Sequence, residues 1–244
     1  MTEFQYKRAP ITEAIVEFRS AIPVDEKKRK KALKKLSQLY ENHNPFPLRD
    51  IKLEVNREGE TKTKTTESTL DKFSSNDMTQ QLQITDISFG VSQLAPYNGW
   101  EQYYLRIKRD WETWRRTVSF RPIERAGMRY INRIDLPLTG SLVHYEDYLE
   151  VYPEIPALLD PTSDHSLNVR VRLTDIESVL NLKSAVVESP LPDHMAIVLD
   201  LDIGRTYQTP PDDEELYSFI SQARIKKNEI FEACITDKAR ELFS

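Results

Sequence analysis

The sequence predicts an α+β protein in which one or more mainly antiparallel sheets carry long helices packed on one face. Several stretches alternate apolar and polar residues, as half-buried strands do, and two long stretches repeat apolar residues at helical spacing. The longest alternating stretch is 125–137, in which Met128 and Tyr130 point to one side and Arg129 and Arg133 to the other. We therefore expect 125–137 to be a central strand.

The first half of the chain is expected to run strand, helix, strand, strand, helix. Asp25 is placed to cap the first helix, and Glu58-Gly59 predicts the turn of a hairpin. A phase change predicts a bulge near Thr85, and Asn98 is placed to cap a helix whose apolar stripe holds all three tryptophans. The expected ranges are a strand at 11–22, a helix at 25–40, a turn at 42–47, a hairpin at 49–67, a polar loop at 70–79, a strand at 81–94 and a helix at 99–118.

The second half is expected to run strand, short helix, strand, strand, helix. Asp212 and Glu215 resemble a capping box at the start of the last helix, and Thr236-Asp237 predict a break near its end. The apolar stripe of this helix is interrupted by Lys227, and it suits packing either on the chain's own sheet or on a second copy in a homodimer. After 125–137, the expected ranges are a short helix around 145–151, strands at 167–173, 176–188 and 195–203, and a helix at 213–243.

The whole chain, 1–244, is expected to form a single domain. The similar order of elements in its halves suggests two pseudo-repeats, 1–120 and 121–244, in a duplicated ferredoxin-like arrangement. This organisation rests on element order, because the halves share no similarity at the level of residues.

The composition narrows the class of protein. A formal net charge of -5 provides no overall positive field to draw the chain to nucleic acid. No apolar run approaches the roughly 20 residues that span a bilayer, and the N-terminus has no apolar signal segment, so a cytoplasmic protein without membrane contact is expected. Cys234 is the only cysteine, which leaves no internal disulfide, and its place on an apolar stripe predicts a buried, unreactive thiol.

No familiar catalytic motif is present, so the sequence predicts no catalytic residue, no metal and no cofactor, and it leaves open whether the protein is an enzyme. The six glycines form no phosphate-binding cluster, and the zinc-protease and serine-hydrolase motifs are absent. The histidines lie in expected loops and are interpreted as surface residues, because a metal or acid–base role would need two of them to converge. They are His43, His144, His165 and His194.

The outward face of the expected strands is the most specific candidate site in the sequence. Guanidinium groups donate two hydrogen bonds to one carboxylate or phosphate, so arginines on neighbouring strands could line a groove for an anionic ligand. The alternative is an ordinary charged face, in which these arginines pair with Glu13, Glu17, Asp200 and Asp202 across strands. The candidate ligand-binding residues are Glu17, Arg19, Arg129, Arg133, Arg170 and Arg172.

A second candidate is a basic patch on the first helix, which could meet nucleic acid or an acidic partner. The alternative is a solvated helix face, and no aromatic residue is interleaved there to stack on bases. The patch consists of Lys27, Lys28, Lys30, Lys31, Lys34 and Lys35.

Three blocks of sequence carry a family resemblance: Pro10-Ile-Thr-Glu-Ala-Ile-Val-Glu17, Gly127-Met-Arg-Tyr-Ile-Asn-Arg-Ile134 and the stretch from Lys227 to Lys238. Tyr97-Asn-Gly-Trp-Glu101 and Leu199-Asp-Leu-Asp-Ile203 also fit. The chain resembles a sporadically distributed, uncharacterised prokaryotic protein family of about this length. The resemblance implies no reaction and no cofactor, but the patchy distribution implies a mobile operon of the toxin–antitoxin or phage-defence type.

The sequence is therefore consistent with two functions. The first is a non-enzymatic binding or accessory protein that acts through a protein partner, using the basic patch and the exposed sheet face. The alternative is a protein or enzyme that binds a phosphate-bearing ligand, either a nucleotide or nucleic acid, with the arginines of the sheet face.

Overall fold

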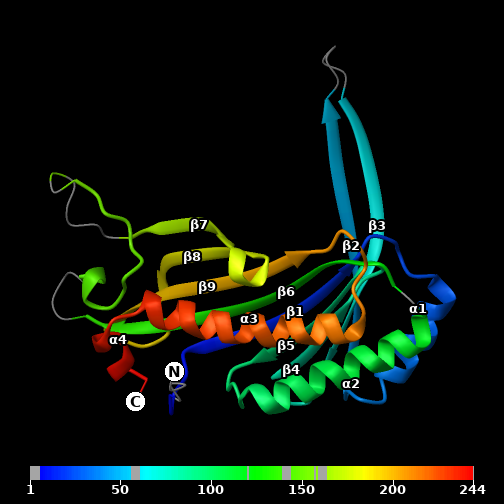
Figure 1. Cartoon of the computed structure of the whole chain (residues 1–244), viewed down its shortest axis with the longest axis horizontal. Helices are drawn as coiled ribbons and strands as arrows, with labels where there is room; N and C mark the ends of the chain where they lie inside the picture. The colour runs from blue at the N-terminus through cyan, green and yellow to red at the C-terminus, as the bar shows by residue number, and fades with distance from the viewer. Residues whose placement is uncertain are drawn as a thin grey trace.

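The computed structural model describes residues 6–55, 61–119, 121–138, 144–156, 158 and 164–243. In this part of the chain, nine strands form one antiparallel sheet in the order β2-β3-β4-β5-β1-β6-β9-β8-β7, accompanied by four α-helices (Figure 1). The strands are β1 (Ile11–Ser20), β2 (Asn42–Val55), β3 (Thr61–Ser74), β4 (Gln80–Ile84), β5 (Ser88–Leu94), β6 (Ile123–Pro137), β7 (Ser166–Leu173), β8 (Ser178–Glu188) and β9 (His194–Thr206). The helices are α1 (Glu26–Leu36), α2 (Trp100–Val118), α3 (Asp213–Cys234) and α4 (Asp237–Glu241).

The expected central strand is confirmed as β6, which lies between β1 and β9. Its pairing sets Ala14 opposite Tyr130 and Val16 opposite Met128, so these apolar residues share one face of the sheet. Residues of the other parity, including Arg125 and Arg129, point to the opposite face. One face of β6 is therefore mainly apolar, and the other face is charged.

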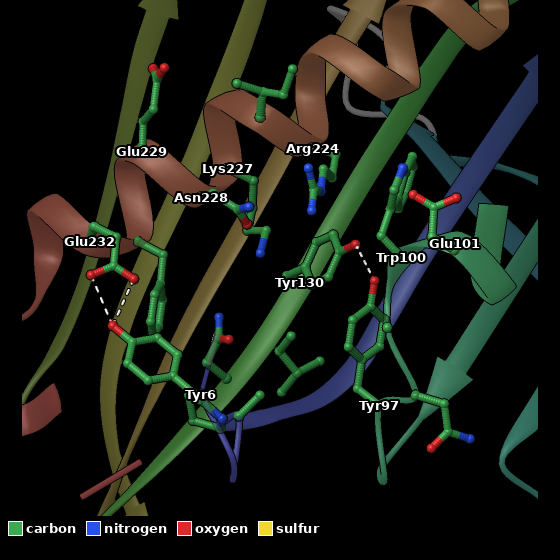
Figure 2. Close-up of a pocket in the computed structure, with 18 of the residues that line it drawn as sticks. Tyr6, Tyr97, Trp100, Glu101, Tyr130, Arg224, Lys227, Asn228, Glu229 and Glu232 are labelled. Atoms are coloured by element: carbon green, nitrogen blue, oxygen red, sulfur yellow. Dashed lines mark hydrogen bonds between the residues drawn. The ribbon is translucent and has the colours of Figure 1, made fainter. Parts of the chain in front are cut away.

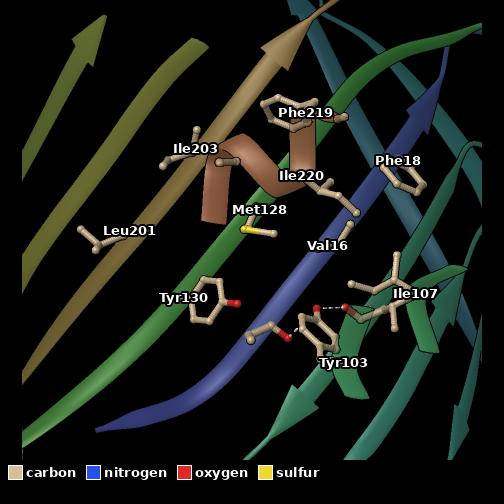
Figure 3. Packing of buried hydrophobic residues seen from close by; sticks show 14 of the residues in the cluster. Val16, Phe18, Tyr103, Ile107, Met128, Tyr130, Leu201, Ile203, Phe219 and Ile220 are labelled. Atoms are coloured by element: carbon tan, nitrogen blue, oxygen red, sulfur yellow. Dashed lines mark hydrogen bonds between the residues drawn. The ribbon is translucent and has the colours of Figure 1, made fainter. Parts of the chain in front are cut away.

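The buried core joins the sheet to the helices. Phe18 of β1 and Phe89 of β5 contact Trp111 of α2, with ring centroids 4.8 and 5.3 Å apart. Helix α3 contacts β6 and β9, while α1 packs against α2. Figure 3 shows Phe219 of α3 and Met128 of β6 within the same buried cluster.

Strand β2 corrects the expected turn at 42–47. It pairs with β3 residue by residue from Asn42 opposite Ser74 to Val55 opposite Thr61. Because β2 is the edge of the sheet, its prolines remove no required ladder donor, so the chain stays extended where the sequence favours a turn. Only 71–74 of β3 also pair with β4, so the rest of the hairpin projects as a two-stranded arm (Figure 1).

Three further differences lie in the first half. The phase change near Thr85 is a turn between β4 and β5, in which the amide of Ser88 donates to Oγ1 of Thr85 at 2.9 Å, and not a bulge. The expected polar loop at 70–79 begins as strand, because β3 continues to Ser74. The predicted turn at Glu58-Gly59 lies outside the described residues.

The helix starts follow the expected caps with one exception, whereas α1 ends at Leu36, four residues before the expected end at 40. Asp25 and Asp212 accept backbone hydrogen bonds at the starts of α1 and α3, and Thr236 caps α4 after α3 ends. Helix α2 begins one residue later than expected, because Gly99 and not Asn98 is its N-cap. None of the helices described here is long and apolar enough to cross a membrane.

Helix α2 also carries a buried charge. Arg106 is buried and donates to the backbone carbonyl of Ser92 at 2.7 Å. Burial raises the pKa of the neighbouring Asp110, which accepts a hydrogen bond from Tyr40. These polar contacts join α2 to β5 and to the end of α1.

Phe18→Ala is expected to lower the free energy of unfolding by about 3–5 kcal/mol, because it leaves a cavity beneath Trp111 in a closely packed core. Urea unfolding followed by circular dichroism measures the change. Ile22→Ala is the control: its side chain is 58% exposed, so a change within about 0.5 kcal/mol is expected. Equal losses for both variants would contradict this packing.

Candidate functional site

A cleft of about 1160 Å³ opens between the start of α2, strand β6 and the C-terminal half of α3 (Figure 2). The segment 6–11, which precedes and enters β1, closes its outer end. The lining is mixed: aromatic rings, amides, two cations and several carboxylates face one space. The polar and aromatic lining residues are Tyr6, Tyr97, Asn98, Trp100, Glu101, Gln102, Tyr130, Asn132, Arg224, Lys227, Asn228, Glu229, Phe231 and Glu232.

The floor of the cleft is formed by Tyr130 and Asn132, both on the helix-facing side of β6. Their side chains are almost fully buried. The hydroxyls of Tyr97 and Tyr130 lie 3.1 Å apart and share a hydrogen bond, while Asn132 donates to the carbonyl of Leu199 at 3.0 Å. Burial, with Tyr97 adding to it, raises the pKa of Tyr130 well above its usual range, so the floor stays neutral.

Both cations of the cleft come from α3 and lie against aromatic rings. Lys227 is only 7% exposed, and its Nζ is 4.1 Å from the centroid of the Tyr130 ring. The guanidinium of Arg224 lies 5.8 Å from the centroid of the Trp100 ring. Such contacts partly replace the hydration of a cation, because the face of an aromatic ring is electron-rich.

The start of α2 adds a third positive element. Its N-cap, Gly99, has a φ of 98° and supplies no side-chain cap. The first turn of a helix has backbone N–H groups without intrahelical partners and carries partial positive charge. Gly99 to Gln102 line the same cleft as Arg224 and Lys227, so this end of the cleft suits a carboxylate or another anion.

At the outer end of the cleft, the carboxylate of Glu232 is bound by two side chains of the protein itself. Tyr6 donates to both oxygens of Glu232 at 2.8 and 2.9 Å, and Nε of Arg240 donates to the same carboxylate at 2.9 Å. Burial, followed by the contact with Glu232, raises the pKa of Tyr6. Glu232 is thus neutralised within the protein, and the segment at Tyr6 is tied to α3.

The cleft gathers stretches that are far apart in the sequence. Pro10 precedes β1, Tyr97 precedes α2, Tyr130 lies on β6 and Lys227 on α3. Each belongs to one of the blocks that carry the family resemblance, yet the sequence analysis predicts none of them as a site residue. The available signal was Lys227, a charged residue within an apolar helical stripe.

The opposite face of the sheet holds most of the predicted ligand-binding residues, and four of them form ion pairs. Arg129 donates through Nε and Nη2 to the buried carboxylate of Asp200 at 2.8 and 2.6 Å. Arg133 lies 3.2 Å from Asp135, and Arg19 lies 3.2 Å from Glu17. Pairing across strands, the alternative left open by the sequence, therefore describes Arg129.

Arg125 is a residue of this face that sequence reasoning missed. Its guanidinium lies between Glu17 and Asp202, at 3.3 and 3.4 Å. It also covers two glycines: a Cβ added to Gly127 or Gly204 would come within 2.8 Å of its nitrogens. Glycines at both positions therefore give the guanidinium room to lie against the sheet.

Arg170 and Arg172 are exposed on β7, at the edge of the sheet, and within the described residues neither makes an ion pair. They line a hollow of about 440 Å³ that also reaches Arg125. A neighbouring hollow of about 390 Å³ extends from Arg125 and Arg129 toward the base of the arm at Leu48. The predicted arginines thus separate into a paired central group and an edge pair.

The predicted basic patch lies on α1, away from both the cleft and the sheet-face hollows. All six lysines are exposed. Lys30 pairs with Glu26 at 2.6 Å, and Nζ of Lys28 lies 3.5 Å from Oγ of Ser119. Arg29, in contrast, turns toward the sheet and pairs with Asp71.

The histidines and the cysteine are separate from the cleft. Among the described residues, no three His, Cys, Asp or Glu side chains gather as a metal would require. His43 lies within β2 and not in a loop, and its Nε2 is 2.7 Å from Asp71. Cys234 is buried as expected, and burial raises the pKa of its thiol to about 11.

Comparison with known proteins assigns no family to this chain. A scan against protein-family models finds no match, and a search of curated proteins finds no significant relative. The resemblance to the prokaryotic family therefore stays a prediction.

Arg129→Ala is expected to lower the free energy of unfolding by about 2–3 kcal/mol, because it leaves the buried Asp200 carboxylate without its bidentate partner. Arg133→Ala is the matched control on the same strand: its partner Asp135 is 19% exposed, against 7% for Asp200, so water can solvate the carboxylate left behind and a loss of about 0–1 kcal/mol is expected. Chemical unfolding of both variants and of Asp200→Asn measures the difference. A loss for Arg129→Ala no larger than that for Arg133→Ala would contradict a stabilising role of the bidentate pair.

The Cys234 thiol is expected to react with iodoacetamide at pH 8 about two orders of magnitude more slowly in the folded protein than in urea. The pKa of about 11, against about 8.5 for a free cysteine, keeps the thiol protonated. Folding raises this pKa, so the thiol's contribution to stability is complete below about pH 8.5 and is lost as the pH rises toward 11. A native alkylation rate with a midpoint near pH 8.5 would contradict this environment.

Proposed function

We propose that the protein is a non-enzymatic binding protein that acts through a protein partner, and that the cleft between α2, β6 and α3 takes a segment of that partner. The observation that carries the proposal is the gathering of the uncapped start of α2, Arg224 and Lys227 at one end of a large, aromatic-lined cleft. We therefore prefer the cleft to the basic patch and to the sheet face as the surface that contacts the partner.

The size of the cleft favours a peptide over a small molecule. Pockets for drug-sized ligands hold about 300–1,000 Å³, and this cleft, at about 1160 Å³, is somewhat larger. Trp100, Tyr97 and Phe231 offer rings for apolar side chains. The exposed amides of Asn98 and Gln102 have both donors and acceptors, as a peptide backbone does.

The charges of the cleft favour a segment that carries a carboxylate, such as a chain terminus. Arg224, Lys227 and the start of α2 would receive the carboxylate, since a guanidinium or a helix N-terminus hydrogen-bonds to its oxygens. Glu101 lies in the first turn of α2, at this same end, and would suit a basic side chain next to the bound carboxylate. Glu229, further along the wall, already pairs with Lys226 at 2.6 Å.

We further infer the finer organisation of the chain. Phe18 contacts α2 and Tyr130 contacts α3, and both side chains lie on one face of the sheet, which supports long helices packed on that face. In 1–120, β1 lies beside β5, and in 121–244, β6 lies beside β9, which supports two pseudo-repeats in a duplicated ferredoxin-like arrangement. A cytoplasmic accessory protein of a mobile prokaryotic operon fits the family resemblance.

Selection from a displayed library of random peptides with free C-termini tests the proposed cleft. Enriched peptides are expected to bind the purified protein in calorimetric titrations, and Arg224→Ala is expected to weaken binding about tenfold or more, because it removes a charge-assisted hydrogen bond. Arg116→Ala is the control, since this arginine lies on the exposed side of α2 and pairs with Glu112.

Three outcomes would contradict the proposal. The first is that no peptide is enriched over an unrelated protein, and the second is that the enriched peptides bind Arg224→Ala and Trp100→Ala as tightly as the unsubstituted chain. The third is turnover of any substrate by the purified protein alone, which would make it an enzyme. Circular dichroism of each variant confirms that the fold is retained.

A further inference from the structure

The sheet face opposite the cleft carries a second built surface, the hollow of about 440 Å³ over β6, β9, β8 and β7. Register places its residues in rows: Arg172 is opposite Val179, Val179 is opposite Gly204, and Gly204 is opposite Gly127. Paired residues of an antiparallel sheet share one face, so Arg172 and the two glycines belong to the same surface.

Arg125 is held so that it presents a flat face to this hollow. Its guanidinium lies over Gly127 and Gly204, and Glu17 and Asp202 contact its nitrogens from the sides. The side chain is still 29% exposed. The carboxylates lie at the edges of the guanidinium, and the backbone of the two glycines lies beneath it. The part left to solvent is therefore its upper face, and the face of a guanidinium stacks on an aromatic ring.

The charge around Arg125 explains why a ring, and not an anion, belongs there. Two carboxylates neutralise this one arginine, so the position has no excess positive charge to attract a phosphate. Stacking requires no net charge, because the interaction is with the face of the ring. Arg125 thus serves as a platform.

The excess positive charge lies at the edge, where Arg170 and Arg172 outnumber Glu177, a carboxylate that lines the same hollow. They are two residues apart on β7, so both side chains project from the same face of the sheet, about 7 Å from each other along the strand. Strands are about 4.8 Å apart, which places β7 about 10 Å from the glycine row on β9. A sugar can bridge such a separation between a base and its phosphates.

We propose that this hollow binds a nucleotide, with the base stacked on Arg125 and the phosphates on Arg170 and Arg172. The chemistry recognised is a planar base joined through a sugar to phosphate, and it is independent of the peptide cleft. Either a free nucleotide or a nucleotide within single-stranded nucleic acid could supply it.

Calorimetric titration of the full chain with ATP, GTP and a single-stranded dodecanucleotide tests the proposal and distinguishes the two sources. Adenosine and inorganic triphosphate are titrated separately, so that base and phosphate contacts are measured apart. We expect one of the three nucleotide probes to bind more tightly than either fragment. The joint substitution of Arg170 and Arg172 by alanine is expected to weaken that binding about thirtyfold or more, because two charge-assisted contacts are lost.

Gly204→Ala tests the platform without changing any charge. The three atoms nearest to the added Cβ, at 2.8–3.2 Å, all belong to the guanidinium of Arg125, the far end of a flexible side chain, so Arg125 is displaced while the sheet is kept. We expect binding of the nucleotide probe to weaken about fivefold or more, and binding of triphosphate to remain unchanged. Gly90→Ala is the matched control on the same face, because its Cβ would lie 3.7 Å from the nearest atom, an ordinary contact.

Three results would overturn the proposal: no binding of ATP, GTP or the dodecanucleotide; binding that survives the loss of both edge arginines; or binding lost in Arg224→Ala, which would move the nucleotide to the cleft. Arg116→Ala controls for the general loss of positive charge. Phosphate contacts also predict that binding weakens as salt rises, and this dependence should be smaller in the variant that lacks Arg170 and Arg172.

Discussion

The pairing of β1 with β6 at the middle of the sheet is the interaction on which both candidate surfaces depend. This register sets Ala14 beside Tyr130 on one face and Glu17 beside Gly127 on the other. A slip of one residue would exchange the two faces, burying arginines and exposing the ring that forms the cleft floor. Because burying an unpaired charge costs several kcal/mol, the apolar core on one face fixes where the polar residues of the other face lie.

Among the described residues, the arginines of the polar face that lie on the central strand β6 have carboxylate partners, whereas those on the edge strand β7 make no ion pair. Arg129 has a buried carboxylate as a bidentate partner, and Arg125 has two longer contacts above its glycine floor. Arg170 and Arg172 lie on an edge strand, where water can solvate them. An arginine flanked by strands on both sides loses hydration and needs a protein partner, whereas an edge arginine keeps its hydrogen-bonding groups for a ligand.

On the helix side, the same logic applies to a lysine. Lys227 occupies an apolar position of α3, and the Tyr130 ring beneath it partly offsets the loss of hydration. Placing this charge near the start of α2 raises the local positive potential, since a helix N-terminus carries partial positive charge. Neither helix alone would create such a site, because each contributes only one part of it.

Local pattern alone was enough to determine β6, α2 and most helix caps. Alternation over 125–137, the tryptophan spacing on α2, and the residues Asp25, Asp212 and Thr236 act on near neighbours, so their physics is written in short windows of sequence. The extended backbone at 42–47 was decided by pairing with β3, a partner that local propensity does not include. Tertiary structure likewise brought Arg129 to Asp200 and joined Pro10, Tyr97 and Lys227 in one cleft. These contacts depend on which distant segments pack against one another, and the free energy of burial that favours them is gained only when the sheet forms.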